Sequence, residues 1–346
     1  MIRFSEIGPF NSGLAPVKQK GKWGFINKIG DLQIPCEYDL VRLPSGDKGM
    51  IAAKRNKKWG YIDTDNITII DFSFDDILSF WEGLAPAKQG KLYGVIDEYG
   101  KMIIRPIYNV ISQSFNHIFL AKKNIKWGFI DGTGNILLPF IYDNATVFSF
   151  GVSYVRIGQK HGFINLLGEF ILELTSQQQV YPIDFHKNFE SVVNFEFIPV
   201  VTKKGRKEYD WSIYSNKGEL IADSLKYRWI NTFNKGIAAV YSYGNKPKWG
   251  MINSQAELII PCEYDKIFPF QCGLAFASKG KYCGYINKDN QIKIPFKYKE
   301  ASTFYDNLAF VSTDRWYGQF IDTEGNTVLN LRKEKTFRNI LNYLAE

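Results

Sequence analysis

The stretch KWGFINKIGDLQIPCEYD, residues 22–39, holds the pattern that decides the fold. Its parts, K-W-G-Φ-I-[DN], a turn glycine and then I-P-x-x-Y-D, return along the whole chain about every 34 residues. The anchor aromatic or its replacement falls at Trp23, Trp59, Tyr93, Trp127, His161, Trp211, Trp249, Cys283 and Tyr317. The gaps between successive anchors are 36, 34, 34, 34, 50, 38, 34 and 34 residues. A period this regular predicts one supersecondary unit per repeat, each burying its apolar face against its neighbours.

One repeat, residues 13–39, contains three short apolar runs, GLAPV, WGFI and LQIP, separated by turn residues. Each run has the length of a strand and is too short for a globular helix. In most units Asp or Asn follows the anchor by four residues and Gly or Asn by seven, which is typical of a type I turn with a G1 bulge. We therefore expect each unit to be a three-stranded antiparallel meander.

The anchor ring and the glycine after it are interpreted as structural. Glycine inside a strand usually marks the close approach of another backbone or a ring, and the simplest account is that each ring packs over a neighbouring glycine. The ladder of rings could instead form a carbohydrate or peptide platform, but its strict period beside a glycine favours core packing. The anchors are Trp23, Trp59, Tyr93, Trp127, Trp249, Gly24, Gly60, Gly94, Gly128 and Gly250.

These units predict an all-β chain in which about nine repeats over residues 1–331 stack as a twisted solenoid. A closed propeller-like ring is the alternative, because units of this length also build blades. The irregular gaps of 50 and 38 residues would disturb a ring more than an open stack, so the solenoid is preferred.

The last residues, 332–346, break the β pattern. Four apolar residues fall on one face of a short amphipathic helix: Phe337, Ile340, Leu341 and Leu344. We expect this C-terminal helix to cap the open end of the array, and docking on another protein is the alternative.

The repeats resemble the WG-repeat (KWG-repeat) family of bacterial β-repeat proteins, over residues 4–330. The resemblance rests on KWGFIN at 22–27, KWGYID at 58–63, KWGFID at 126–131, KWGMIN at 248–253 and IIPCEYD at 259–265. It implies a β-repeat array used as a binding or scaffolding module, and it brings no catalytic residues. The repeat diverges over residues 169–231, where the fifth unit loses its I-P-x-x-Y-D and the sixth keeps only the outline.

The composition limits the class of protein. With 45% hydrophobic and 16% aromatic residues the chain can bury a large core and is not disordered. Lys and Arg exceed Asp and Glu by 43 to 35, which permits an acidic partner without requiring one. The four cysteines lack CxxC spacing and are expected to be reduced. No signal peptide and no run of about 18 apolar residues is visible, so we expect a cytoplasmic protein without membrane insertion.

A lysine-rich hairpin turn, repeated in each unit, is the first candidate for a partner-binding surface. Stacking would align these turns into a positive ridge, along which nucleic acid or another acidic surface could lie. The alternative is that the lysines are solvated turn residues that keep β edges from pairing. The ridge is represented by Lys22, Lys58, Lys91, Lys126, Lys160, Lys248 and Lys281.

The diverged segment 169–231 is the second candidate, with an expected exposed loop that carries Tyr181, Phe185 and His186. Selection for a partner, drift and a structural insertion all explain the divergence. The run DTDN at 63–66 superficially resembles a calcium loop, but the EF-hand spacing is missing and a turn is favoured.

Enzyme chemistry has little support in the sequence, because HExxH, GxSxG, P-loop and Cys/His patterns are absent. An enzyme with its site in residues 169–231 would need convergent ionisable groups, and no clear pair is present there. We therefore expect a non-catalytic scaffold, without cofactor or metal, that binds another protein. Binding of an anionic polymer along the lysine ridge is the alternative.

Overall fold

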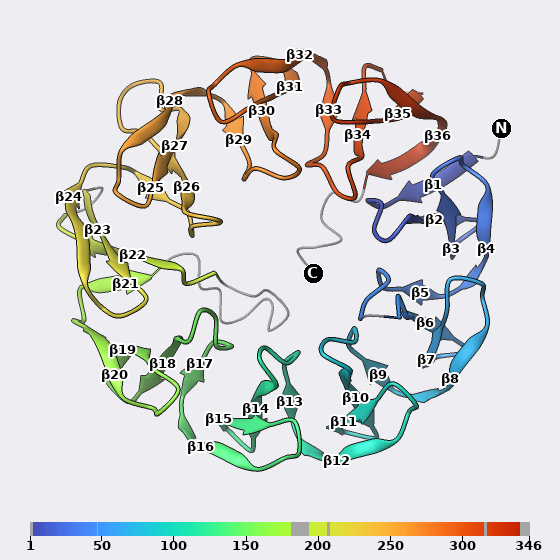
Figure 1. The fold of residues 1–346 in the computed structure, drawn as a ribbon, viewed down its shortest axis with the longest axis horizontal. Coiled ribbons are helices and arrows are strands. Elements are labelled where there is room, and N and C mark those ends of the chain that lie inside the picture. Colours follow the sequence, from blue (N-terminus) through green and yellow to red (C-terminus); the bar gives the residue numbers. More distant parts are fainter. Residues whose placement is uncertain (1–2, 47, 181–193, 206–207, 315–316, 340–346) are drawn as a thin grey trace. The chain divides into compact units, whose positions relative to one another are not determined.

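The computed structural model describes residues 3–339, except 47, 181–193, 206–207 and 315–316. Every helix or strand element in these residues is a β-strand. No described segment is therefore an apolar helix able to cross a bilayer. The strands form seven four-stranded sheets and one eight-stranded sheet in which two such sets join edge to edge (Figure 1). Each set of four is called a blade here, and the described residues make nine of them.

The chain divides into two compact units, Met1–Phe140 with Phe304–Glu346, and Ile141–Thr303. The blades that lie wholly or mainly in the first unit are β1 (Arg3–Ile7), β2 (Leu14–Gln19), β3 (Lys22–Asn27), β4 (Leu32–Tyr38); β5 (Leu40–Val41), β6 (Ile51–Arg55), β7 (Lys58–Ile62), β8 (Thr68–Phe74); β9 (Asp76–Ile77), β10 (Leu84–Gln89), β11 (Leu92–Asp97), β12 (Met102–Tyr108); β13 (Val110–Ile111), β14 (Ile118–Lys123), β15 (Lys126–Asp131), β16 (Ile136–Tyr142); and β33 (Glu300–Ala301), β34 (Ala309–Ser312), β35 (Tyr317–Ile321), β36 (Thr327–Asn339).

The second unit holds four blades. They are β17 (Asn144–Ala145), β18 (Ser153–Ile157), β19 (Lys160–Ile164), β20 (Phe170–Leu174); β21 (Gln178–Val180), β22 (Phe197–Lys203), β23 (Tyr209–Ser215), β24 (Leu220–Leu225); β25 (Trp229–Ile230), β26 (Ile237–Tyr241), β27 (Trp249–Asn253), β28 (Leu258–Tyr264); and β29 (Lys266–Ile267), β30 (Ala275–Lys279), β31 (Tyr282–Ile286), β32 (Ile292–Tyr298).

Each blade has one strand more than the predicted meander. The extra strand is the first of the blade, such as β5, which is only two residues long and follows directly after the last strand of the preceding blade. Leu40 and Val41 pair with Lys54 and Ala53 of β6. The prediction of three-stranded units was wrong because a two-residue strand has no periodicity to read, and its partner lies in the next repeat.

The glycine after most anchors lies closest to a backbone carbonyl oxygen, and Gly128 lies closest to the ring of Phe140, which is not an anchor. A Cβ added to Gly60 would lie 2.6 Å from the carbonyl oxygen of Ile70 and 2.9 Å from the amide nitrogen of Phe72. The pairing of β7 with β8 shifts register at this point, between Trp59 and Tyr61. The glycine therefore permits a β-bulge in which the last strand of the blade approaches closely.

The predicted turns are confirmed, and three of the five anchor rings are buried as predicted. Asn27 opens the turn after β3, its side-chain oxygen accepts bonds from two later backbone amides, and Gly30 has a φ of +91°. The rings of Trp23, Trp59 and Trp127 are at most 5% exposed and belong to the core. Tyr93 and Trp249 are half-buried.

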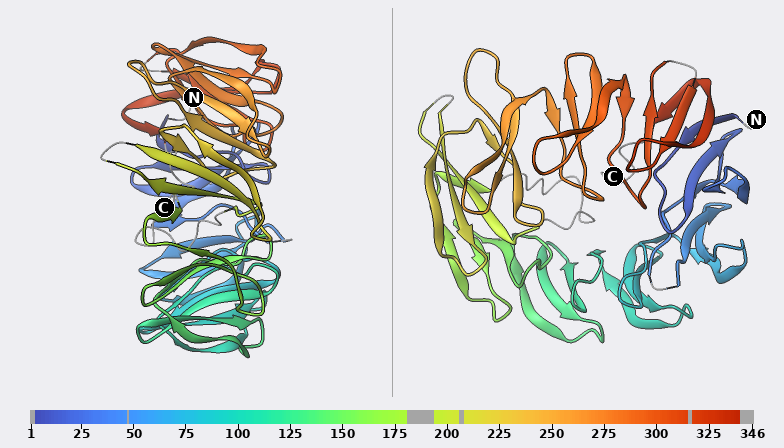
Figure 2. Two further views of the ribbon diagram at one scale, coloured as in Figure 1. Left: turned by 90° about the vertical axis from the view of Figure 1, so that its left-hand side faces the viewer. Right: turned by 45° about the horizontal axis from the view of Figure 1, so that its top comes forward.

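The two ends of the described chain share one sheet. The last strand, β36, runs parallel to β1 and pairs Arg332 with Arg3 and Asn339 with Ile7. Figure 2 shows the red strands of the last blade beside the blue strands of the first. An open stack would keep its terminal repeats apart, so the predicted solenoid is wrong and the fold is a β-propeller.

The predicted C-terminal helix is also wrong over residues 332–339, which are the extended second half of β36. Phe337 belongs to this strand, whereas Ile340, Leu341 and Leu344 lie outside the described residues. The helical spacing of four apolar residues is a weak local preference. The unpaired edge of β1 offers backbone hydrogen bonds that outweigh it.

Candidate functional site

A Lys–Asp bridge recurs at three of the regular junctions between blades. The lysine before the anchor contacts the aspartate that ends the repeat: Lys58 Nζ lies 2.6 Å from Asp75 Oδ1. The other carboxylate oxygen of Asp75 accepts the backbone amide of Gly90, in the next blade, at 2.7 Å. The hydrogen bond from Lys58, followed by that from Gly90, lowers the pKa of Asp75. The same bridge joins Lys22 to Asp39 and Lys248 to Asp265.

The predicted lysine ridge is largely used in these internal contacts. Lys22, Lys58 and Lys248 form Lys–Asp bridges, and Lys160 pairs with Glu173 at 2.8 Å. Lys126 also has an interaction partner. Lys91 and Lys281 are exposed and form no ion pair with a carboxylate of the described chain.

The second predicted site is only partly described. Tyr181, Phe185 and His186 lie outside the described residues. The rest of segment 169–231 keeps the repeat architecture, since strands β21 to β24 form a complete blade followed by β25 of the next. The divergence therefore changes side chains on an intact frame.

At the junction of this blade with β25–β28, the residues of the Lys–Asp bridge are exchanged. The backbone amide of Arg228 donates to the carbonyl oxygen of Tyr241 at 2.8 Å, as Asp75 does to Lys88 at 3.0 Å in a regular junction. Arg228 therefore occupies the position that Asp75 has in the regular junction, and Tyr241 occupies the position of Lys88. Asp210, just before the anchor Trp211, replaces the bridging lysine and pairs with Lys226.

The turn between β26 and β27 is three residues longer than its counterpart between β6 and β7. Trp249 follows Tyr241 by eight residues, whereas Trp59 follows the equivalent Lys54 by five. The longer turn reaches back to the preceding blade, where the backbone amide of Tyr209 donates to the hydroxyl of Tyr243 at 3.1 Å. This hydrogen bond supports one side of an opening between the two blades.

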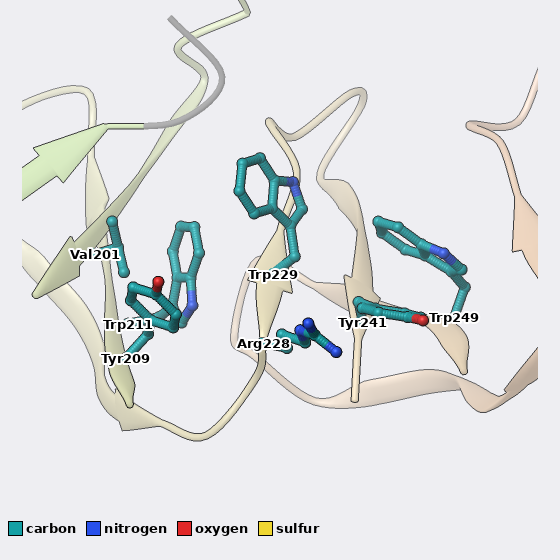
Figure 3. A pocket seen from close by; sticks show the side chains of 7 residues that line it. All are labelled: Val201, Tyr209, Trp211, Arg228, Trp229, Tyr241 and Trp249. Carbon is teal, nitrogen blue, oxygen red and sulfur yellow. The ribbon is translucent and has the colours of Figure 1, made fainter. Parts of the chain in front are cut away.

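The opening is a pocket of about 560 Å³, which Figure 3 shows from close by. Trp229 lies between the group of Tyr209 and Trp211 on one side and the stacked rings of Tyr241 and Trp249 on the other. The stacked rings have centroids 4.8 Å apart, and Trp211 meets Trp229 edge-on at 6.2 Å. The pocket is lined by Val201, Tyr209, Trp211, Arg228, Trp229, Tyr241 and Trp249, and is called the aromatic pocket below.

The polar groups of the aromatic pocket are few. The indole nitrogen of Trp211 donates to the carbonyl oxygen of Tyr227 at 3.0 Å, and that of Trp229 donates to Asn231 at 2.7 Å. Arg228 is exposed, and its guanidinium lies 6.0 Å from the ring centre of Tyr241. It has no ion pair with any carboxylate that the structure describes. The pocket thus offers ring faces and one uncompensated positive charge.

Sequence reasoning identified Trp211 and Trp249 as repeat anchors and missed the rest of the aromatic pocket. The signal was present: in the aligned repeats Y-D becomes Tyr227-Arg228, and the anchor gap widens to 38 residues between Trp211 and Trp249. What the sequence alone does not show is that both changes face the same opening.

Side chains that could hold a metal ion are not gathered in the described part of the chain. It contains no cluster of three or more His, Cys, Asp or Glu side chains suited to a metal ion. In DTDN, Asp63 accepts the backbone amides of Asp65 and Ile67, which confirms the turn. The four cysteines are free thiols, as predicted, and burial raises the pKa of Cys36, Cys262 and Cys283.

Comparison with protein families gives a match to the WG containing repeat. The matched segments, which make up more than half of the chain, are residues 2–23, 23–59, 59–93, 93–124, 127–160, 249–283 and 284–315. The unmatched interval between residues 160 and 249 contains β21 to β26 and most of the aromatic pocket. No curated protein sequence matches the chain.

One solved structure matches the fold over nearly its whole length. A structure described as "Crystal structure of the eukaryotic initiation factor" matches with a TM-score of 0.61 at 9% identity, covering 95% of this chain and 98% of that one. At this identity the likeness concerns the fold alone, and it supports the correction from a solenoid to a propeller. Among the others are KlHsv2 with loop 6CD replaced by a Gly-Ser linker (TM-score 0.39, 11% identity, 74% and 97% covered) and BamB from Moraxella catarrhalis (0.39, 12%, 69% and 80%).

Proposed function

This chain belongs to the WG containing repeat family, and on that premise we propose that it is a non-catalytic scaffold that binds another protein through the aromatic pocket. The observation that carries the proposal is the exchange of a Lys–Asp bridge for a pocket of half-buried aromatic rings beside the exposed Arg228. Trp, Tyr and Arg are the residues that most often dominate binding energy at protein interfaces.

The chemistry of the pocket lining supports binding rather than catalysis. Its seven residues are one valine, two tyrosines, three tryptophans and one arginine. They include no carboxylate, imidazole or thiol that could serve as general base or nucleophile at neutral pH. Elsewhere in the chain, burial raises the pKa of the Cys36, Cys262 and Cys283 thiols, which makes them weak nucleophiles.

The anionic-polymer alternative has less support. A surface that binds a polyanion gains affinity from lysines that are free to replace the condensed counterions. Four of the seven lysines chosen for the ridge are already paired with carboxylates of the same chain. The remaining exposed lysines are best used as the matched control for the pocket.

The test is affinity capture from the native lysate with the full chain, with and without nuclease and at two salt concentrations. Three baits are compared: wild type, the pocket variant Trp229→Ala with Arg228→Glu, and the control Lys91→Glu with Lys281→Glu. We expect one discrete protein to be recovered by wild type and control under all conditions and lost with the pocket variant.

Equal recovery by the pocket variant would place the contact elsewhere and contradict the proposal. Recovery of nucleic acid alone, lost with salt and in the lysine variant, would favour the ridge. Urea unfolding of all three baits shows whether a lost partner reflects a lost fold. Trp229→Ala without Arg228→Glu is the milder second variant if the double variant unfolds.

A further inference from the structure

The size and the side chains of the aromatic pocket limit what it can bind. A volume of about 560 Å³ is within the range of small-ligand sites and suits a short segment rather than a folded surface. Tyr209 is tied to Tyr243 at 3.1 Å, and Tyr241 is stacked on Trp249, so the walls are held in place by internal contacts. A pocket that is already ordered costs little conformational entropy on binding.

The indole hydrogen bonds argue against a sugar. A carbohydrate buries many hydroxyls, each of which needs a partner or costs free energy. Trp211 and Trp229 already donate their indole N–H groups to Tyr227 and Asn231. The lining therefore presents mainly ring faces, and an apolar ring such as that of proline meets it without unpaired polar groups. Proline-rich segments in the polyproline II form dock on aromatic-lined grooves for this reason.

The charge of the pocket decides what flanks the apolar ring. A cage of tryptophan and tyrosine rings would suit a cation, but a cation placed here would be repelled by Arg228. The nearby pair Lys226–Asp210 and the bridge Lys248–Asp265 compensate themselves. Two exposed carboxylates lie nearby, Glu208 and Asp223, the second of them close to Lys204. They are outnumbered by the exposed lysines of the two adjoining turns, Lys203, Lys204 and Lys246. The balance favours an anion, and a guanidinium binds a carboxylate through two parallel hydrogen bonds.

We propose that the aromatic pocket binds a short extended peptide segment in which prolines, seated against Trp229 and Trp249, are flanked by an acidic residue that pairs with Arg228. This inference rests on the proposed function and names the class of partner segment. The prolines give the segment a stiff apolar surface that packs against the rings. The acidic residue gives Arg228 the negative partner that it lacks within the described chain.

The test is isothermal titration of the full chain with four probes. They are the blocked peptides acetyl-Glu-Pro-Pro-Pro-Glu-amide, acetyl-Lys-Pro-Pro-Pro-Lys-amide and acetyl-Glu-Gly-Gly-Gly-Glu-amide, and the oligosaccharide maltohexaose. We expect the acidic proline peptide to bind saturably. The basic proline peptide should bind at least about tenfold more weakly, as expected for reversing one charge pair, and the glycine peptide and the sugar should give no saturable binding.

Reversing the charge at position 228 gives the most decisive comparison in this experiment. Arg228→Glu should exchange the preference, so that the basic proline peptide binds better than the acidic one. Trp229→Ala should abolish binding of both, and Lys91→Glu with Lys281→Glu should leave wild-type affinities. Each variant is first shown to be folded under the binding conditions by a cooperative urea transition, which for Trp229→Ala includes the small loss of stability expected for that ring. Arg228→Gln replaces Arg228→Glu if the reversal unfolds the blade.

Equal affinity for the acidic and basic peptides, no effect of Arg228→Glu, or binding of maltohexaose alone would overturn the inference. If lysate capture depends on Trp229 while no proline peptide binds, the peptide class is wrong and the proposed function stands. If the acidic proline peptide binds as expected but no protein is captured, the proposed function fails and the peptide site stands.

Discussion

Two junctions between neighbouring blades differ in side chains on the same backbone frame. Between β5–β8 and β9–β12, Asp75 bonds through its backbone to Lys88 and through its carboxylate to Lys58 and Gly90. Between β21–β24 and β25–β28, Arg228 keeps the backbone bond to Tyr241 and makes no ion pair with a described carboxylate. The comparison teaches that backbone bonds hold the junction, while the side chain at this position decides between a closed bridge and an open pocket.

The largest expected difference between the two junctions is in the cost of losing a tryptophan. Trp59→Ala removes a ring that is 5% exposed and should lower the free energy of unfolding by about 3–5 kcal/mol. Trp229→Ala removes a half-buried ring and should cost about 1 kcal/mol, because less apolar area is withdrawn from water. Urea unfolding of both variants measures the difference. Similar costs would mean that Trp229 is a core residue and would weaken the comparison.

The glycine after the anchor gives a smaller contrast. Gly60→Ser would force a Cβ to within 2.6 Å of the Ile70 carbonyl oxygen, and should cost about 1–3 kcal/mol of stability. The corresponding position in the diverged blade already holds a side chain, Ser212, whose hydroxyl donates to Asp223 at 2.7 Å. Ser212→Gly should therefore cost only about 1 kcal/mol, mainly for the lost hydrogen bond. Thermal and urea unfolding compare them, and a tolerated Gly60→Ser would contradict the bulge argument.

The smallest expected effect concerns pH. The pKa of Asp75 is lowered by Lys58 and Gly90, so its stabilising effect is present above the unfolded pKa of about 4 and is lost as pH falls through the lower folded value. Asp75→Asn should therefore be less stable than wild type at neutral pH and equal to it in stronger acid. Arg228→Gln should show no such dependence, because the exchange removes no carboxylate from the junction. Unfolding midpoints measured from neutral to acid pH test both; parallel curves for Asp75→Asn and wild type would contradict the bridge.

The local part of the fold could be predicted because it is written in neighbouring residues. The turn at Asn27 and Gly30 and the buried rings of Trp23 and Trp127 follow from spacing within one repeat, and these predictions are confirmed. The ring-over-glycine packing was wrong for a related reason: spacing marks a close approach at Gly60 but does not say which group approaches. Contacts between backbone atoms that are far apart in the sequence cannot be recognised from the spacing of neighbouring residues.

The aromatic pocket could not be predicted from the sequence, because it too depends on contacts between residues that are distant along the chain. Segment 169–231 was correctly seen to diverge, yet the residues chosen from it, Tyr181, Phe185 and His186, lie outside the described chain and leave that choice untested. Arg228 and Trp229 were within the segment and were overlooked, since a charge exchange in one repeat matters only when its neighbours in the next blade are known.

The sequence by itself determined the repeat period, the all-β content, the family and the buried anchors, because each rests on short apolar runs and turn residues that recur in every unit. Only the tertiary structure decided the fourth strand of each blade, the pairing of β36 with β1 and the pocket around Trp229. These three features join residues of different repeats, and the backbone hydrogen bonds gained at an open strand edge outweigh the local preference of residues 332–339 for a helix.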